Sequence, residues 1–273
     1  MQIYNSYEPS TGRISLSKGN QLKFCVGGYW YKTDYLGYEG AAEIAASDLL
    51  EQSNIEEIAP FVRYEFEKIW LNDKKYRGCK SKDFAGKNQI ITLDEFITKY
   101  SEQTAEQFVQ GLNTEDKITK VVDFIRKNTD ITNFGEYLTA LFEFDAFIYN
   151  EDRHFNNIAL LKSGKEYSLC PVFDNGAAFL SDIEIYGTQT KIGLERKSVK
   201  SKPFSTDFDE QIDACRALFG EQLKFSDNLE LSPDVCLDIL TNYGDNVWSR
   251  IKNTVDFSKN IHPEMLQNFE REI

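Results

Sequence analysis

Three side chains near one another in the sequence could together transfer a phosphoryl group. Asp152 and Asn157 stand in the spacing Asp-x-x-x-x-Asn, in which the aspartate accepts the proton of a substrate hydroxyl and the asparagine holds magnesium. Asp174 follows in the sequence Phe-Asp-Asn-Gly and offers a carboxylate ligand for the metal. The pattern therefore predicts phosphoryl transfer from ATP bound with Mg2+.

The segment between Asn157 and Asp174 predicts how these side chains meet. Two short apolar runs, 158–161 and 167–172, are joined by a turn that contains glycine, as in an antiparallel hairpin. Because a hairpin brings its open ends together, we expect Asn157 and Asp174 side by side. A single Asp or Asn near a strand end is usually a turn former, but here the spacing, the hairpin and the second Asp agree.

His154, Pro171 and Phe173 extend this pattern into one that resembles the HipA-type serine/threonine kinases, whose signature runs Asp-x-His-x-x-Asn and then Pro-x-aromatic-Asp. The resemblance implies an α/β (α+β) protein-kinase-like fold with ATP and Mg2+ as cofactors. Its two lobes would be a small β-rich N-lobe over residues 1–92 and a larger helical C-lobe over residues 93–273.

The resemblance also implies roles for the site residues. Asp152 would orient or deprotonate a serine or threonine hydroxyl of a protein substrate, and Asn157 and Asp174 would bind the metal. The only other histidine is His262, so a histidine-rich metal site is excluded, and His154 is expected to support the catalytic loop. Autophosphorylation and a toxin role with a helix-turn-helix antitoxin as partner would follow from the same family.

Two alternatives stay open. The string Asp-Arg-His-x-x-Asn also resembles phosphatidylinositol 3- and 4-kinases, so a phosphoinositide or small-molecule kinase is the first. The second is a nucleotide-binding pseudokinase that serves as a partner-binding module, although the base and metal residues are all present. Arg153 within the string is either a phosphate partner or an ordinary surface charge.

Lys32 is the candidate for the lysine that pairs with the α- and β-phosphates of ATP. It lies on the second strand of a hairpin predicted around Gly27-Gly28, just before a helix predicted over residues 40–50. An acidic residue of that helix should hold the ammonium group, and Glu39 and Glu43 share one helical face. The family resemblance favours Glu39. The alternative is an ordinary surface lysine with two surface glutamates.

A loop that covers the phosphates is expected before the first strand of this hairpin. Gly19 and Gln21 lie in a stretch that resembles the Gly-x-Gln-x-Lys of HipA-type kinases, but neither of the common glycine-rich phosphate motifs is present. As in short HipA-like kinases, the chain is expected to begin almost directly at this loop. Ser15 and Ser17, or more weakly Ser10, are the expected autophosphorylation sites, where a phosphate would disturb the loop.

The remaining patterns predict mainly helices. Strands are expected at 61–69 and 89–92, and the polar segment 74–88 is predicted to be the hinge between the lobes. Helices are expected at 94–100, 115–127, 133–149, 207–219, 232–242 and 247–255. A basic cluster follows Asp174, where a kinase has its activation segment and substrate surface, although such charge runs are usually solvated loops. Its members are Lys191, Arg196, Lys197, Lys200 and Lys202.

Composition limits the partners. The net charge is −13, with 44 acidic and 31 basic residues, so the field of the molecule disfavours direct nucleic-acid binding and anionic membranes. No apolar run is long enough to span a bilayer and no secretion signal is visible. Five scattered cysteines without a Cys-x-x-Cys pair favour free thiols in a reducing cytoplasm and no structural zinc.

Overall fold

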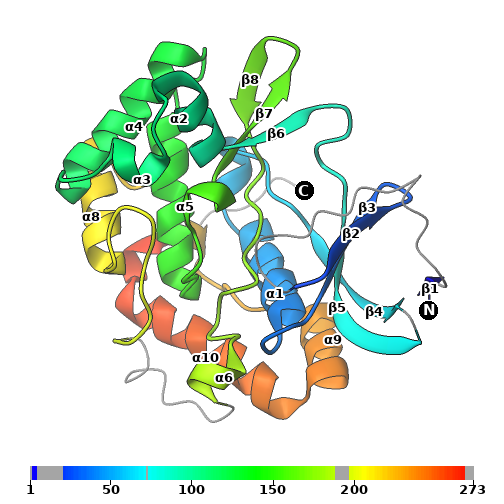
Figure 1. Cartoon of the computed structure of the whole chain (residues 1–273). Helices are drawn as coiled ribbons and strands as arrows, with labels where there is room; N and C mark the ends of the chain where they lie inside the picture. The colour runs from blue at the N-terminus through cyan, green and yellow to red at the C-terminus, as the bar shows by residue number, and fades with distance from the viewer. Residues whose placement is uncertain (1, 5–20, 72, 188–196, 268–273) are drawn as a thin grey trace.

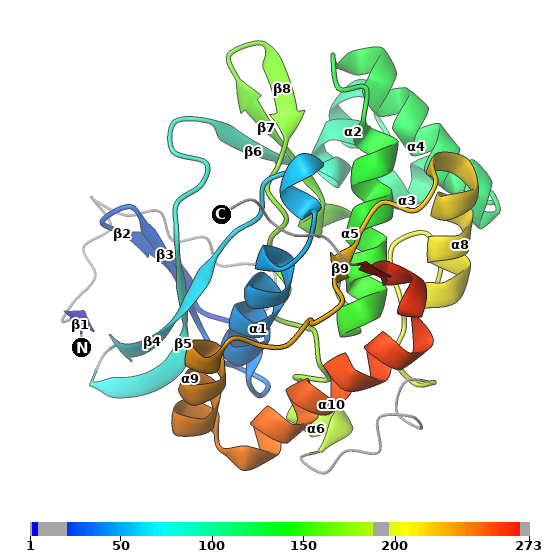
Figure 2. The same cartoon turned by 180° about the vertical axis from the view of Figure 1, so that it is seen from behind.

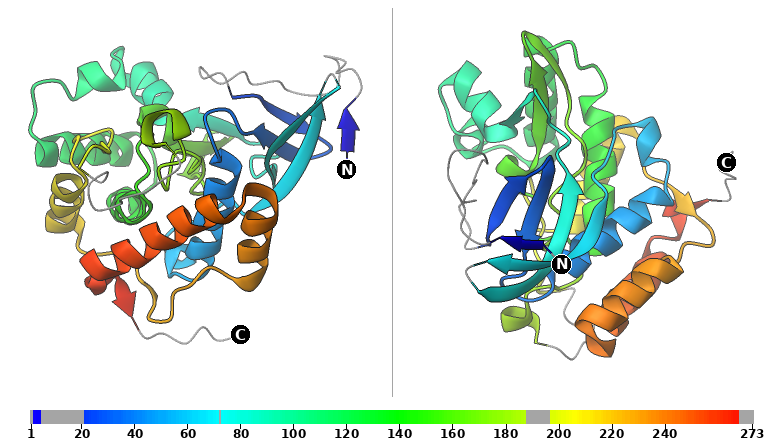
Figure 3. Two further views of the ribbon diagram at one scale, coloured as in Figure 1. Left: turned by 90° about the horizontal axis from the view of Figure 1, so that it is seen from below. Right: turned by 90° about the vertical axis from the view of Figure 1, so that its right-hand side faces the viewer.

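A five-stranded sheet forms the smaller of the two parts of the molecule (Figure 1). The computed structural model describes residues 2–4, 21–71, 73–187 and 197–267. The strand order in this sheet is β1-β4-β5-β3-β2. The strands are β1 (Gln2–Tyr4), β2 (Lys23–Val26), β3 (Tyr29–Thr33), β4 (Tyr64–Leu71) and β5 (Lys74–Lys82). Figure 3 shows β1 at the edge of the sheet, where it pairs in parallel with β4.

Helix α1 (Glu39–Glu51) covers one face of this sheet and joins it to the helical part. Its alanine-rich sequence favours a helix with little side-chain bulk, and most of its residues are buried. It contacts β4 and β5 on one side and α9 on another. Figure 2 shows α1 between the sheet and the central helix α5. Side chains of α1 can therefore contact both parts of the molecule at their junction.

The larger part is helical and is built around α5 (Phe134–Ile148), all but one of whose residues are buried. Side-chain caps define several helix starts: Thr92 and Glu95 form a capping box at α2, and Asp207 caps α8. The other helices are α2 (Leu93–Ser101), α3 (Ala105–Phe108), α4 (Thr114–Asn128), α6 (Ile183–Tyr186), α8 (Phe208–Phe219), α9 (Pro233–Tyr243) and α10 (Asp245–Ile261). Short 3₁₀ turns are η1 (Ile55–Glu57), η2 (Phe155–Asn157) and η3 (Pro263–Met265).

The predicted hairpin after the catalytic motif is present. Strands β7 (Ala159–Ser163) and β8 (Glu166–Leu169) pair antiparallel, and Gly164 at their turn has a left-handed backbone. Strand β6 (Gln89–Thr92) pairs with β7 and not with the five-stranded sheet. A further pair, β9 (Phe225–Ser226) with β10 (Leu266–Gln267), lies near the C-terminal end of the described chain.

The predicted two-lobed fold is confirmed, with one error along the chain. Five of the six helices form within one residue of their expected bounds, and the hairpin around Gly27-Gly28 is present, but α10 extends six residues beyond the expected end at 255. The predicted hinge over 74–88 is wrong for its first nine residues, which form β5 in the interior of the sheet. The polar composition of the segment indicates a linker. The backbone is nevertheless hydrogen-bonded on both sides, to β3 and to β4, and the lysine side chains project from this strand. No described helix has the length and apolarity to cross a membrane.

Glycines set the distance between α1 and the sheet. A Cβ atom on Gly40 of α1 would lie 2.8 Å from the carbonyl carbon of Gly78 in β5. A Cβ atom on Gly78 would lie 1.9 Å from the carbonyl oxygen of Lys32. The helix and the strand therefore approach at the level of their backbones, which brings the side chains beyond this contact close to β3.

We expect Gly78→Ala to lower the free energy of unfolding by about 1–3 kcal/mol, because the added methyl group meets the Lys32 carbonyl oxygen and forces β5 and β3 apart. The measurement is urea denaturation followed by circular dichroism. Lys82→Ala, an exposed position on the same strand, is the matched control and should change stability by less than about 0.5 kcal/mol. Equal stability of the Gly78 variant and the unchanged protein would contradict the packing argument.

Candidate active site

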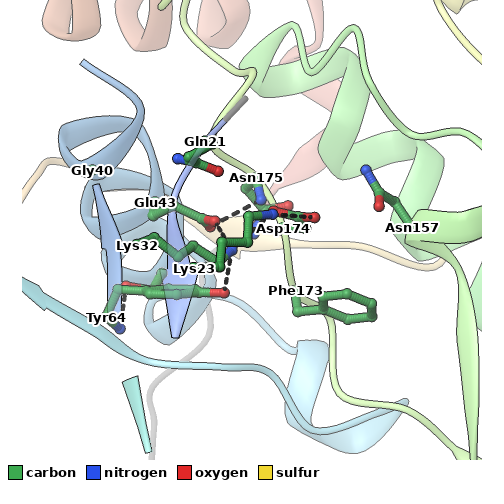
Figure 4. A network of polar contacts seen from close by, with 12 residues as sticks. Gln21, Lys23, Lys32, Gly40, Glu43, Tyr64, Asn157, Phe173, Asp174 and Asn175 are labelled. Atoms are coloured by element: carbon green, nitrogen blue, oxygen red, sulfur yellow. Dashed lines mark hydrogen bonds and ion pairs between the residues drawn. The ribbon is translucent and has the colours of Figure 1, made fainter. Parts of the chain in front are cut away.

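A buried lysine lies at the centre of the site (Figure 4). Nζ of Lys32 on β3 donates to a carboxylate oxygen of Glu43 on α1, and lies 2.8 Å from Oδ1 of Asp174. Its third contact is the hydroxyl of Tyr64, at 3.2 Å. Burial by itself lowers the pKa of Lys32, but the Asp174 and Glu43 carboxylates outweigh it and raise the pKa well above its ordinary value. The ammonium group is therefore charged at every physiological pH.

Glu43, and not Glu39, is the partner of Lys32. Glu39 is the first residue of α1, and helical side chains lean toward the N-terminus of their helix. Its carboxylate therefore accepts hydrogen bonds from the backbone N–H groups of the preceding turn, at 2.6 Å from Leu36 and 3.2 Å from Gly37. The prediction that Glu39 holds the lysine is thus wrong. Glu43 stands one helical turn further and faces the sheet, with 1% of its side chain exposed.

Asp174 is held by two lysines in this structure. Besides Lys32, Nζ of Lys23 on β2 lies 3.2 Å from each of its carboxylate oxygens. Burial raises the pKa of Asp174, but the two ammonium groups outweigh this and hold its pKa well below its usual range. Its backbone has a φ of 60°, a left-handed conformation that aspartate tolerates better than most residues. The site therefore keeps an ionised carboxylate at this turn.

Arg153 is neither on the surface nor free for a phosphate. Its guanidinium forms a two-pronged ion pair with Asp145 of α5, at 2.9 and 3.0 Å, and each side chain is 1% exposed. Nη1 donates to the carbonyl oxygens of Asn157 and Phe173, at 3.1 and 2.6 Å. One nitrogen therefore joins the two ends of the β7–β8 hairpin, a contact that the hairpin pattern did not predict.

Two asparagines complete this buried network. Asn150 donates from its amide to Asp145 at 2.8 Å, and Asn175 accepts from Arg153 at 2.6 Å. The backbone N–H of Asn175 donates to the second oxygen of Glu43 at 2.9 Å. Arg153, Asn175 and Glu43 thus connect the loop that carries Asp152 to the loop that carries Asp174 and to helix α1.

The catalytic-motif loop is folded by its own side chains. His154 accepts at Nδ1 from the N–H of Asn156 and so caps the turn η2, while its Nε2 lies 3.7 Å from Oδ2 of Asp152. These contacts fit the expected support of the loop. The side chain of Asp152 is 45% exposed, and its Oδ1 accepts from Nζ of Lys202 at 2.8 Å. The carboxylate is thus accessible from solvent.

The donor set suits magnesium. Nδ2 of Asn157 donates to the carbonyl oxygen of Asp152 at 2.8 Å, so Oδ1 is the amide atom that could bind a metal ion. Figure 4 shows Asn157 on the side of Asp174 that is away from Lys32. An amide oxygen and a carboxylate are hard ligands of the kind that Mg2+ takes together with waters and nucleotide phosphates. Among the described residues no group of three or more His, Cys, Asp or Glu side chains forms a separate metal site.

The expected phosphate loop is only partly described. Gly19 and the serines at 10, 15 and 17 lie outside the described residues, as do Lys191 and Arg196 of the basic cluster. Gln21 is described, and its amide nitrogen donates to the carbonyl oxygen of Thr33 at 2.9 Å, next to Lys32 on β3. Nucleotide binding by Gly19 and Gln21 stays a prediction.

Sequence spacing does not identify the roles of four side chains that shape the site. Lys23 is only the end of the Gly-x-Gln-x-Lys stretch, Glu43 is the less favoured partner of Lys32, Arg153 has two open interpretations and Lys202 is one of five basic residues. The alternation of residues on β2 and β3 is the signal that could have identified Lys23, because Lys23 and Lys32 are direct cross-strand partners.

Comparisons with known proteins support the fold. No protein-family model matches the sequence, and no curated protein does. The proinflammatory kinase CtkA of Helicobacter pylori is similar, with a TM-score of 0.61 at 15% identity over 95% of this chain and 94% of that chain. A structure of HipA with HipB and operator DNA from Shewanella oneidensis MR-1 has a TM-score of 0.45 at 11% identity, over 100% of this chain and 63% of that chain. The match to CtkA confirms the kinase-like fold.

We expect Arg153→Met to lower the free energy of unfolding by about 3–5 kcal/mol, because it leaves Asp145 buried without its counter-ion. Arg63→Met is the matched control. Arg63 is 51% exposed and pairs with Glu51 and Glu56 at the surface, so its loss should cost less than about 1 kcal/mol. Guanidinium denaturation of both variants measures the difference. Similar losses in the two would show that the buried pair has no special structural role.

Proposed function

We propose that this chain is an ATP-dependent kinase that phosphorylates serine or threonine hydroxyls of a protein. The observation that carries the proposal is the position of Lys32, which is buried, charged and in contact with both Glu43 and Asp174. A strand lysine paired with a helix glutamate, beside a carboxylate that can bind metal, is the arrangement that anchors ATP phosphates in protein kinases.

The chemistry divides among the site residues. Lys32 would bind the phosphates of ATP, and Lys23 offers a second positive charge at the same carboxylate. Asn157 and Asp174 would hold Mg2+, which neutralises charge on the phosphates when it is bound. Asp152 would orient the acceptor hydroxyl and accept its proton. Catalysis would then rest on positioning and on positive charge that is in place before the reaction.

The exposure of Asp152 supports a large acceptor. Its carboxylate is 45% exposed, so a hydroxyl on a protein surface can reach it. The match to CtkA supports the kinase fold, and the Asp-x-His-x-x-Asn signature motivates the choice of serine or threonine as acceptor. Autophosphorylation near Ser15 or Ser17, and a toxin role with a helix-turn-helix antitoxin, remain parts of the same proposal.

The proposal is tested by incubating the protein with radiolabelled Mg-ATP alone, with generic protein substrates and with phosphoinositide vesicles. Label on protein serine or threonine, including the chain itself, is expected. Asp152→Ala should remove at least about 99% of turnover and change ATP affinity less than about threefold, because the base faces the acceptor. Asp174→Ala should weaken Mg-ATP binding in calorimetry, since it removes a metal ligand.

Asp130→Ala, an exposed aspartate away from the site, is the control and should behave like the unchanged protein. Label on phosphoinositides alone would favour the lipid kinase. ATP binding without transfer to any acceptor would favour the pseudokinase. Full turnover by the Asp152 variant would reject the assignment of the base.

The Lys32–Glu43 pair makes a second prediction. Lys32→Ala should reduce turnover by about 10²–10³-fold, because it removes charge that stabilises the transition state, and Arg should not restore it, since the guanidinium does not fit the compact site. Glu43→Gln should also lower turnover, whereas Glu39→Gln should leave it within about threefold. Steady-state kinetics with each variant separates the two glutamates. If Lys32→Ala stayed active while Lys23→Ala lost activity, the nucleotide lysine would be on β2.

A further inference from the structure

A lysine from outside the catalytic loop contacts the proposed base. Nζ of Lys202 lies 2.8 Å from Oδ1 of Asp152, fifty residues away in the sequence. Among the described residues, the other basic side chain within 4 Å of this carboxylate is His154, whose Nε2 lies 3.7 Å from Oδ2. Lys202 thus adds a full positive charge at the place where an acceptor hydroxyl would bind.

The segment around Lys202 is fixed by buried contacts. Gln211 of α8 is 1% exposed, and its amide nitrogen donates to the carbonyl oxygen of Lys202 at 2.9 Å. Its amide oxygen accepts from the backbone N–H groups of Phe204 and Ser205, at 2.9 and 3.2 Å. One buried side chain therefore binds three backbone groups of residues 202–205.

An aromatic contact ties the same segment to the catalytic loop. The ring of Phe204 is 1% exposed and packs edge-on against Phe142 of α5 and Phe155 of η2, with ring centroids 5.7 and 5.5 Å apart. Nζ of Lys117 also donates to the carbonyl oxygen of Phe204, at 2.9 Å. The backbone that carries Lys202 therefore has a defined position relative to the loop that carries Asp152.

The two basic side chains of the catalytic loop itself make other contacts. Arg153 is buried and bound to Asp145, and it also donates to two backbone carbonyls, so it cannot reach a phosphoryl group. Nδ1 of His154 accepts the hydrogen bond from the N–H of Asn156 that caps η2. A kinase active site needs positive charge on the side of the acceptor, because the transferred phosphoryl group spreads its charge over three oxygens. Lys202 is placed to supply that charge.

We propose, on the basis of the proposed kinase function, that Lys202 binds the transferred phosphoryl group while it positions Asp152. The bond from phosphorus to the bridging oxygen of ADP breaks, and a bond to the acceptor oxygen forms. The acceptor proton goes to Asp152, and Lys202 stays protonated throughout. An ammonium group has three donors on a flexible stem, so it can contact the carboxylate and a phosphoryl oxygen together.

The test compares Lys202→Ala and Lys202→Arg with Lys200→Ala, an exposed lysine on the same segment. Lys202→Ala should lower kcat by about 100-fold and change KM for ATP less than about threefold, as expected for an interaction made in the transition state. Lys202→Arg should recover part of kcat, and Lys200→Ala should match the unchanged protein. Thermal unfolding of each variant shows whether it is folded.

Calorimetry gives a readout that does not depend on turnover. Binding of Mg-ADP should be the same in all variants, whereas the tighter binding that aluminium fluoride adds, as a mimic of the transferred group, should fall about tenfold or more in Lys202→Ala. If the unchanged protein binds Mg-ADP with aluminium fluoride but transfers no label, the kinase proposal fails while this comparison still tests Lys202. If the unchanged protein does not bind Mg-ADP, both proposals fail.

Three results would overturn the role of Lys202. The first is a kcat of Lys202→Ala that is at least half that of the unchanged protein, and a higher kcat would mark the contact as inhibitory instead. The second is equal enhancement of binding by aluminium fluoride with and without the lysine. The third is a kcat of Lys202→Arg as low as that of Lys202→Ala, with a lowered Tm in both variants. This result would indicate a structural contact.

Discussion

The buried ion pair between Arg153 and Asp145 is the interaction on which the geometry of the site depends. Asp145 belongs to α5, all but one of whose residues are buried. Arg153 binds Asp145 and also donates to the carbonyl groups at both ends of the β7–β8 hairpin. A buried pair of this kind adds little net stability, because both charges lose water. Its effect is instead to specify one arrangement, in which the loop that carries Asp152 and the loop that carries Asp174 have a fixed separation.

A second constraint links this core to the sheet. Glu43 accepts from Lys32 with one oxygen and from the N–H of Asn175 with the other, and Asn175 accepts from Arg153. The close approach of α1 to β5 makes this chain of contacts short enough to span the two lobes. A change in the position of α1 would therefore shift Lys32 and the loop of Asp174 together.

The sequence predicted the parts of the site that depend on local spacing. The positions of Asp152 and Asn157 on one short loop follow from their separation, and the hairpin that returns the chain toward Asp174 follows from two apolar runs. The shared helical face makes Glu39 and Glu43 equal candidates, and the family resemblance favours Glu39. Only the tertiary position of the helix start shows that Glu39 turns back to the preceding loop. Spacing along a helix does not determine which turn faces the sheet.

Burial was the other quantity that spacing could not give. Arg153 follows the base in the sequence and resembles a surface residue, and the segment 74–82 resembles a polar linker. Elements distant in the sequence set their environments. Asp145 on α5 forms an ion pair with Arg153, and β3 and β4 pair with the strand formed by residues 74–82. From sequence alone a charged residue is expected to be exposed, because the partner that would allow its burial is not known. Buried polar networks are therefore the least predictable feature of this fold.

The lysines of the site contrast with the negative net charge of the whole chain. The chain has a net charge of −13, which disfavours the approach of any anion to its surface. In the site, however, Lys23 and Lys32 both contact Asp174, and Lys202 contacts Asp152. Binding of a metal at Asp174 would satisfy that carboxylate and free both lysines for phosphate oxygens. The contacts between lysine and carboxylate therefore hold these ammonium groups in the site despite the net negative charge of the chain.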